Sequence, residues 1–274
     1  MVNGYRPNTL EEALIIRREK EAVPYAGGTD LMVRKDESNV YLFLDQIKEL
    51  QEVREDNDNI YIGAACIYSD LLHNKIIPEI LKMAIHAIAS PAIRNAATIG
   101  GNIGNASPAG DTLPVLYVLN AKLKIRTMDS VDEVPMEDFI LGPKRTTLTR
   151  DAIIEEIIIP KKRGAYPFYY QKIGARKADA ISKLSFAGVF LMEDGIISDI
   201  ACAFGAVGPT VIRDKSIEHI LLGKTIEEAG NIADNVIEQY AAILHPIDDQ
   251  RSTAVYRKKV CLNLLKDFLD KIRT

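Results

Sequence analysis

The sequence is poor in cysteine and histidine, the residues on which zinc sites, iron–sulfur clusters and disulfide frameworks depend. Its 274 residues include four histidines and three cysteines, Cys66, Cys202 and Cys261. The cysteines are far apart and form no Cys-x-x-Cys pair, so we expect no metal site and no iron–sulfur cluster built from this chain alone. Their odd number and wide spacing also argue against a disulfide framework. We therefore expect a protein of a reducing, cytoplasmic compartment.

Clustered positive charge and long apolar runs are missing too. Lys and Arg number 34 against 38 Asp and Glu, a formal net charge of -4. Nucleic acid is therefore not an expected partner, because binding to its phosphate backbone needs concentrated positive charge. No apolar stretch reaches the length of a membrane span, and the first residues, MVNGYRPNTLEEAL, lack the apolar core of a signal peptide. Apolar residues make up 47%, which is ordinary for a globular protein with a sizeable core.

The patterns along the chain indicate an α+β protein. Strands are predicted where short apolar or alternating runs occur, at 40–46, 59–66, 121–127, 152–160 and 167–174. Helical spacing of apolar residues predicts a helix between Pro78 and Ala89 and further helices from Asp214 onward. A hairpin is predicted to turn at Glu193–Gly195. The basic, turn-rich stretch KKRGAYP marks a boundary between domains at 1–163 and 164–274.

Two segments with adjacent glycines are the main functional signal. The first is AGGTDL (26–31), and the second lies within ATIGGNIGNASPAGDTLP (97–114), which we interpret as a long loop of small and polar residues. Adjacent glycines permit positive φ, so successive N–H groups can point at one anion. A lone Gly-Gly pair is more often just a tight turn. Two such pairs, each beside a threonine, favour a ligand with two phosphates.

Other nucleotide-binding and catalytic motifs are not evident. No GK[ST] follows either glycine pair, and neither has the GxGxxG spacing of a dinucleotide fingerprint. No Ser-His-Asp set, Cys-His set or paired-carboxylate signature stands out. This fits a protein whose chemistry belongs to a bound cofactor. Tyr166, Tyr169 and Tyr170 could line a pocket for a ring, although aromatic residues of a strand are more often core.

The glycine segments resemble those of the flavin-binding subunits of the molybdenum hydroxylases, the family of bacterial xanthine, nicotinate and carbon monoxide dehydrogenase medium subunits. The resemblance is carried by PYAGGTDL (24–31) and PAIRNAATIGGNIGNASPAGDTLP (91–114), and it extends to FGAVGPTVIR (204–213) and DDQRSTAVYRKKV (248–260). It implies an FAD-binding fold of the vanillyl-alcohol-oxidase/PCMH type in residues 1–163, with two subdomains divided near residue 55. It also implies a smaller C-terminal domain of strands and helices in residues 164–274.

The resemblance further implies that both glycine segments hold the FAD pyrophosphate. The residues matched in the first segment are Pro24, Tyr25, Ala26, Gly27, Gly28, Thr29, Asp30 and Leu31. Those matched in the second are Thr98, Ile99, Gly100, Gly101, Asn102, Asn105 and Asp111. Lys172 matches a family lysine near the flavin, with the nearby Lys183 as the alternative. No catalytic side chain and no bound metal are implied for this chain.

The implied function is electron transfer within a complex. In this family a large subunit oxidises substrate at a molybdenum cofactor, a small subunit carries two [2Fe–2S] clusters, and the FAD subunit reduces an acceptor, commonly NAD. Two alternatives remain open. One is a stand-alone FAD-dependent reductase of similar fold, for which no catalytic serine and glutamate set is evident. The other is a scaffold subunit that has lost FAD, against which the intact glycine segments argue.

Overall fold

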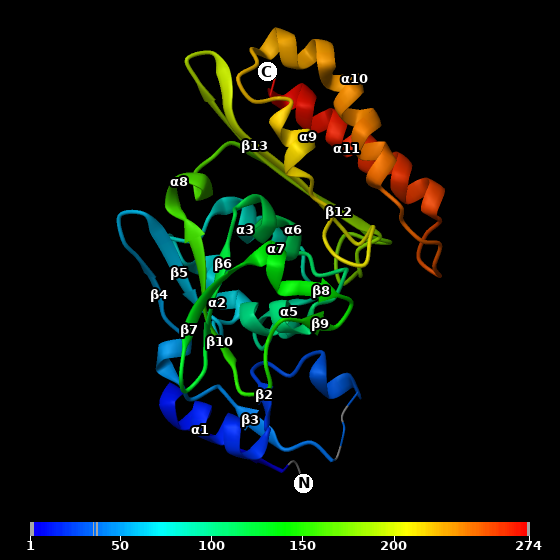
Figure 1. The fold of residues 1–274 in the computed structure, drawn as a ribbon. Helices are drawn as coiled ribbons and strands as arrows, with labels where there is room; N and C mark the ends of the chain where they lie inside the picture. The colour runs from blue at the N-terminus through cyan, green and yellow to red at the C-terminus, as the bar shows by residue number, and fades with distance from the viewer. Residues whose placement is uncertain (1–2, 35, 37, 273–274) are drawn as a thin grey trace. The chain divides into compact units, whose positions relative to one another are not determined.

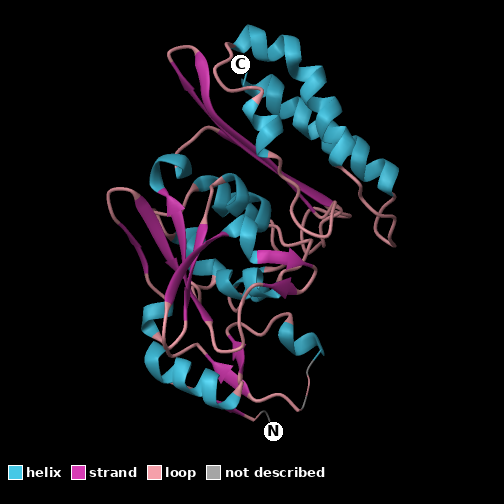
Figure 2. Ribbon diagram, viewed as in Figure 1, coloured by secondary structure: helices cyan, strands magenta, loops and turns pink. Residues whose placement is uncertain are grey.

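The computed structural model describes residues 3–34, 36 and 38–272, which form two compact units (Figure 1). The first unit consists of the chain up to Pro78, Ala89–Ser107 and Asn120–Lys162. The second consists of Glu79–Ile88, Pro108–Leu119 and the chain from Arg163 onward. Both units contain helices and strands (Figure 2), which confirms the predicted α+β class.

Two sheets and a short ribbon form the first unit. The smaller sheet is parallel, in the order β1-β3-β2, with strands β1 (Gly4–Tyr5), β2 (Val23–Tyr25) and β3 (Tyr41–Phe43). The larger is antiparallel, in the order β4 (Val53–Glu55), β5 (Asn59–Gly63), β10 (Ile153–Pro160), β6 (Lys122–Arg126) and β7 (Val131–Pro135). The ribbon pairs β8 (Ile140–Gly142) with β9 (Arg145–Thr146). Because β10 lies in the middle of the larger sheet, its apolar run is almost wholly buried.

Short helices accompany these sheets. They are α1 (Leu10–Lys20), η1 (Leu31–Arg34), η2 (Lys48–Leu50), α2 (Tyr68–His73), α4 (Pro91–Arg94), α5 (Ile99–Asn105) and α7 (Met136–Phe139). Helix α1 starts at Thr9, whose Oγ1 accepts a hydrogen bond from the Glu12 N–H at 3.2 Å. Its Leu10 and Leu14 pack in one core cluster with Leu42 and Leu44 around β3. This core fixes β3, and through its pairing also β2, from which the first glycine segment departs.

Residues 97–114 are not the long loop that we predicted. The Thr98 side chain caps α5 by accepting a hydrogen bond from the Gly101 N–H at 3.0 Å. A second helix, α6 (Leu113–Val118), has Pro114 in its first turn. The prediction was wrong because the capping threonine and the burial of Ile99 and Ile103 outweigh the low helix propensity of the glycines. The stretch is also divided: α5 belongs to the first unit and α6 to the second.

The second unit is a three-stranded antiparallel sheet covered by helices. Its strands, in spatial order, are β11 (Phe168–Ile173), β12 (Leu184–Glu193) and β13 (Ile196–Gly205). The hairpin turns at Asp194 and Gly195, both with positive φ, as predicted. Its helices are α3 (Glu79–His86), α6, α9 (Lys215–His219), α10 (Ile226–Ile243) and α11 (Ala254–Ile272), and α8 (Lys161–Gly164) lies at the boundary between the units. Phe186, Phe204 and Phe268 lie in its main core cluster.

Two buried arginines anchor α6 within the second unit. Arg163 Nε donates to the carbonyl oxygen of Val118 at 2.6 Å, and Arg213 Nη1 donates to that of Tyr117 at 2.6 Å. Arg213 is itself held by Glu218 at 2.9 Å. The last carbonyls of a helix lack donors within the helix, so these guanidinium groups satisfy them.

None of the described helices is long and apolar enough to cross a membrane.

Candidate functional site

Strand β2 leads into the first glycine turn, Ala26–Asp30, which ends at η1. Gly28 has a φ of +67°, a conformation that favours glycine, and a Cβ there would lie 2.2 Å from the hydroxyl oxygen of Tyr25. A Cβ at Gly27 would lie 2.0 Å from the carbonyl oxygen of Ala96. The backbone of Ala96 leaves no room for a side chain at Gly27, and the positive φ favours glycine at position 28.

This turn leaves three successive N–H groups unpaired. Within the described part of the chain, no group accepts a hydrogen bond from the N–H of Gly27, Gly28 or Thr29. Successive N–H groups around a residue with positive φ can form an anion-binding concavity. The residues present therefore fit a phosphate group.

The first turn lies directly against the chain that enters α5. The position of a Cβ on Gly27 is 2.0 Å from the Ala96 oxygen and 2.9 Å from the Ala97 Cα. The two glycine segments, distant in sequence, are thus neighbours in the first unit. Of the predicted residues, Pro24–Leu31, Thr98–Asn102 and Asn105 all lie in the first unit.

The second glycine pair differs from our expectation of another set of free N–H groups. The N–H groups of Ile99 and Gly100 donate to the carbonyl oxygens of Cys66 and Ala64, at 3.2 and 2.9 Å, and that of Gly101 donates to Thr98 Oγ1. A Cβ on Gly100 would lie 2.6 Å from the Ala64 oxygen, so this glycine permits close packing. Gly101 is exposed, and a Cβ there would meet Thr98 Oγ1 alone, at 2.8 Å. Of the pair, only Gly101 therefore offers a bare, exposed helix surface.

Lys144 joins the two segments, although no sequence motif indicates it. It lies in the turn between β8 and β9, directly after Pro143. Its Nζ lies 2.6 Å from Asp30 Oδ2 and also donates to Asn105 Oδ1. Its partners are remote in sequence, so no local spacing could have identified it.

The other two predicted residues, Asp111 and Lys172, lie together in the second unit. Lys172 Nζ is 2.7 Å from Asp111 Oδ2 and donates to the carbonyl oxygen of Ala87 at 2.8 Å, while Ser182 Oγ donates to Asp111 Oδ1. Burial raises the pKa of the Asp111 carboxyl, and the ammonium and hydroxyl groups oppose this rise. Lys183 Nζ lies instead 5.4 Å from the ring centroid of Tyr256. Lys172 is thus the lysine that pairs with Asp111.

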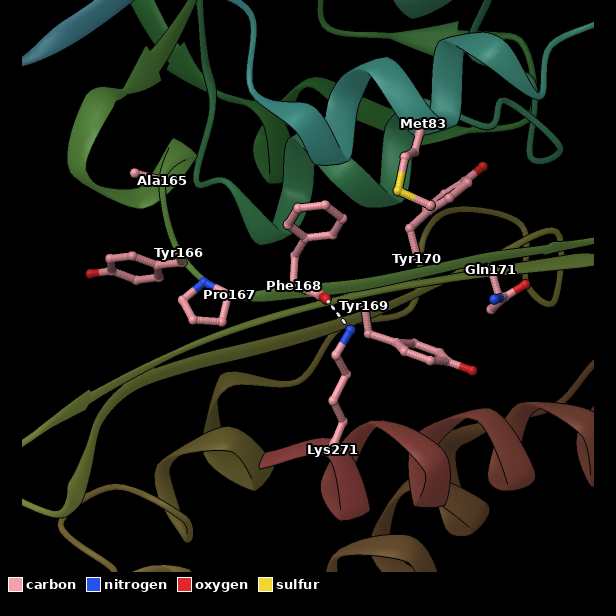
Figure 3. Close-up of a pocket in the computed structure, with 9 residues that line it drawn as sticks. All are labelled: Met83, Ala165, Tyr166, Pro167, Phe168, Tyr169, Tyr170, Gln171 and Lys271. Carbon is pink, nitrogen blue, oxygen red and sulfur yellow. Dashed lines mark hydrogen bonds between the residues drawn. The ribbon is translucent and has the colours of Figure 1, made fainter. Parts of the chain in front are cut away.

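An open cavity of about 630 Å³ runs along β11 in the second unit (Figure 3). Tyr166, Tyr169 and Tyr170, the three tyrosines considered for a ring pocket, all line it. Figure 3 shows Phe168 and Tyr170 on the side of Met83, and Lys271 Nζ donating to the Phe168 oxygen, at 3.2 Å. The Tyr170 hydroxyl is buried and has no hydrogen-bond partner among the described residues. Burial, and next the charge of Asp111, raise the pKa of Tyr170 well above its usual value.

The cysteines show no sign of metal chemistry in the described structure. All three are buried and free, and burial raises the pKa of Cys66 and of Cys261 to about 12. Among the described residues, no group of three or more His, Cys, Asp or Glu side chains could hold a metal ion.

Comparison with known proteins identifies the family. Residues 1–162 match the family described as the FAD binding domain in molybdopterin dehydrogenase, and residues 169–272 match the CO dehydrogenase flavoprotein C-terminal domain. The glyceraldehyde dehydrogenase medium chain of Sulfolobus acidocaldarius is 28% identical over 93% of this chain and 92% of its own length. The xanthine dehydrogenase FAD-binding subunit of Escherichia coli O157:H7 is 30% identical over 78% of this chain and 77% of its own.

Solved structures agree with this match. A chain of the carbon monoxide dehydrogenase from Hydrogenophaga pseudoflava, in a form that lacks the Mo-pyranopterin moiety of its molybdenum cofactor, has a TM-score of 0.90 at 26% identity. The match covers 98% of this chain and 96% of that one. The resemblance read from the sequence is confirmed, together with an FAD-binding domain followed by a C-terminal domain. This chain therefore belongs to the family of FAD-binding medium subunits of the molybdenum hydroxylases, as an FAD-dependent oxidoreductase subunit.

Proposed function

We propose that this chain is the FAD-carrying electron-transfer subunit of a molybdenum hydroxylase complex. It would receive electrons from [2Fe–2S] clusters on a small partner subunit and deliver them to NAD or another acceptor. A large partner subunit would carry the molybdenum cofactor and bind the organic substrate. Relatives along nearly the whole chain support this, among them the nicotinate dehydrogenase FAD-subunit of Eubacterium barkeri, 28% identical over 98% of this chain.

The observation that carries the proposal is the row of N–H groups at Gly27, Gly28 and Thr29, for which no described residue supplies an acceptor. We propose that they donate to the FAD pyrophosphate, because an anion supplies the acceptors that the protein does not. When bound, FAD supplies the ability to accept and pass on electrons. The chain's own part is to hold that cofactor: β2 and the Ala96–Ala97 backbone fix the turn, and exposed Gly101 leaves space beside it.

The other predicted contacts are retained as part of this proposal. They are Pro24, Tyr25, Ala26, Asp30 and Leu31, then Thr98, Ile99, Gly100, Asn102 and Asn105, and, in the second unit, Asp111 and Lys172. We also propose the domain division at 1–163 and 164–274, with two subdomains divided near residue 55. A cytoplasmic location is proposed as well, supported by three cysteines that are free and buried.

The first test is to purify the chain without partners. We expect yellow protein from which acid releases FAD rather than FMN, because a site for two phosphates suits a pyrophosphate. We also expect electron transfer from NADH to an artificial dye, with no hydroxylation of purines or nicotinate. Both activities are measured again after the large and small subunits have been added.

The same experiment separates this proposal from a stand-alone reductase. Addition of the partners should confer hydroxylation on the mixture, and a tagged chain should bring both partners with it from cell extract. Hydroxylation by the lone chain, or release of FMN alone, would contradict the subunit assignment.

A further inference from the structure

Lys144 connects three segments of the first unit. Its Nζ lies 2.6 Å from Asp30 Oδ2 in the first glycine turn and donates to Asn105 Oδ1 at the end of α5. Its own N–H donates to the carbonyl oxygen of Ala106 at 3.0 Å. One residue of the β8–β9 turn thus ties the first glycine turn to the helix that carries the second glycine pair.

The stability of the fold does not explain a lysine at this position. Lys144 has a φ of 59°, which is unfavourable for a residue with a side chain. Its ion pair with Asp30 is exposed, with 53% and 60% of the two side chains accessible, and exposed pairs add little to stability. The arrangement therefore points to a role other than holding the fold together.

Asp30 supplies the reason. It directly follows Gly27, Gly28 and Thr29, whose unpaired N–H groups we assign to the pyrophosphate. A free carboxylate there would repel a bound anion. The Lys144 ammonium cancels this charge and, through its bond to Asn105, holds Asp30 in place.

We propose that Lys144 is a positioning residue of the FAD site, which ties Asp30 to Asn105 and neutralises Asp30 beside the pyrophosphate. This inference rests on the proposed location of the pyrophosphate. It predicts that a positive charge at residue 144 increases the affinity for FAD. It also predicts that the size of this effect depends on whether residue 30 carries a negative charge.

The test is titration of the flavin-free chain with FAD, followed by quenching of flavin fluorescence. Lys144→Met should raise the Kd about tenfold, a change of about 1.4 kcal/mol. Lys144→Arg, which keeps the charge, should stay near the wild type. The matched control is Lys122→Met, because Lys122 forms an equally exposed ion pair with Glu133 in the same unit, at 3.1 Å and with 52% and 53% accessibility. We expect no change in the control.

The double variant Lys144→Met with Asp30→Asn distinguishes neutralisation from a merely structural effect. If Asp30 repels the pyrophosphate once Lys144 is gone, removal of its charge should restore most of the affinity. A double variant as weak as Lys144→Met would overturn the neutralising role, and a Lys144→Met chain that binds FAD like the control would overturn the proposal. If Lys144→Met lowers the melting temperature of the flavin-free chain, Lys144→Gln, which keeps a donor without charge, replaces it with the same expectations.

The variant Gly27→Ala distinguishes a failure of the proposed role of Lys144 from a failure of the proposed pyrophosphate location. A Gly27→Ala chain that retains FAD shows that the pyrophosphate does not bind at the first turn, and both proposals then fail. If a Gly27→Ala chain that still melts cooperatively without flavin loses FAD while Lys144→Met keeps it, the location stands and the role of Lys144 is overturned.

Discussion

The two glycine pairs look alike in sequence and differ in structure. At Gly27–Gly28 the backbone turns through a positive φ and lies against Ala96, and its N–H groups have no acceptor among the residues that the structure describes. At Gly100–Gly101 the backbone begins a helix, and its N–H groups are already bonded to Ala64 and to Thr98. The first pair thus has the donors that an anion would need, whereas in the second Gly100 packs closely and Gly101 is exposed. A Gly-Gly motif indicates that side chains are excluded at these positions, but the physical reason for their exclusion depends on the surrounding fold.

Among variants of the two glycine pairs, Gly27→Ala is expected to have the largest effect on stability and on FAD binding. The added methyl would overlap the Ala96 oxygen, so the turn and the α5 entry must move apart. We expect the free energy of unfolding to fall by about 1–3 kcal/mol and FAD to be lost, measured by urea denaturation and by the flavin content of the purified chain. The control is Gly142→Ala, where nothing lies within 4 Å of the added Cβ. Equal stability of the two variants would contradict the close contact.

Gly101→Asp should act on the ligand more than on the fold. A side chain there meets the Thr98 hydroxyl alone, so the flavin-free chain should still melt cooperatively. The new charge would repel the pyrophosphate, and we expect FAD affinity to fall at least about tenfold. Gly101→Asn has nearly the same shape without the charge and should bind more tightly than Gly101→Asp. Retention of stoichiometric FAD by the Asp variant would show that α5 does not face the phosphates.

The smallest effect is expected from Thr98→Ala. Loss of the cap should lower the free energy of unfolding by about 1 kcal/mol, because the Gly101 N–H loses its acceptor. Thr98→Ser keeps the hydroxyl and should remain close to the wild type in urea denaturation. If the two variants were equally destabilised, the lost methyl group rather than the cap would be responsible.

The features that could be predicted from the sequence are those that depend on the chemistry of residues close together in the chain. The hairpin at Asp194–Gly195 follows from two residues that tolerate positive φ, and β10 follows from an apolar run that suits a central strand. The helix at Ile99–Asn105 was not predicted, because the low helix propensity of its glycines hides the effect of its cap and of its buried residues. Lys144 was not predicted for a different reason: its partners Asp30 and Asn105 lie next to it in the folded chain but are remote in the sequence.

Helix α6 also bears on how the chain is made. All six of its residues, Leu113–Val118, are buried, and the carbonyl oxygens of Tyr117 and Val118 accept hydrogen bonds from Arg213 and Arg163. During synthesis the helix leaves the ribosome well before those arginines and before β12 and β13, which pack against it. The growing chain therefore exposes the sides of the apolar segment Leu113–Val118 that β12 and β13 cover in the finished fold, until those strands emerge. A chain truncated before Arg163 would remain in that aggregation-prone state, although the sequence match to the FAD-binding family ends at 162.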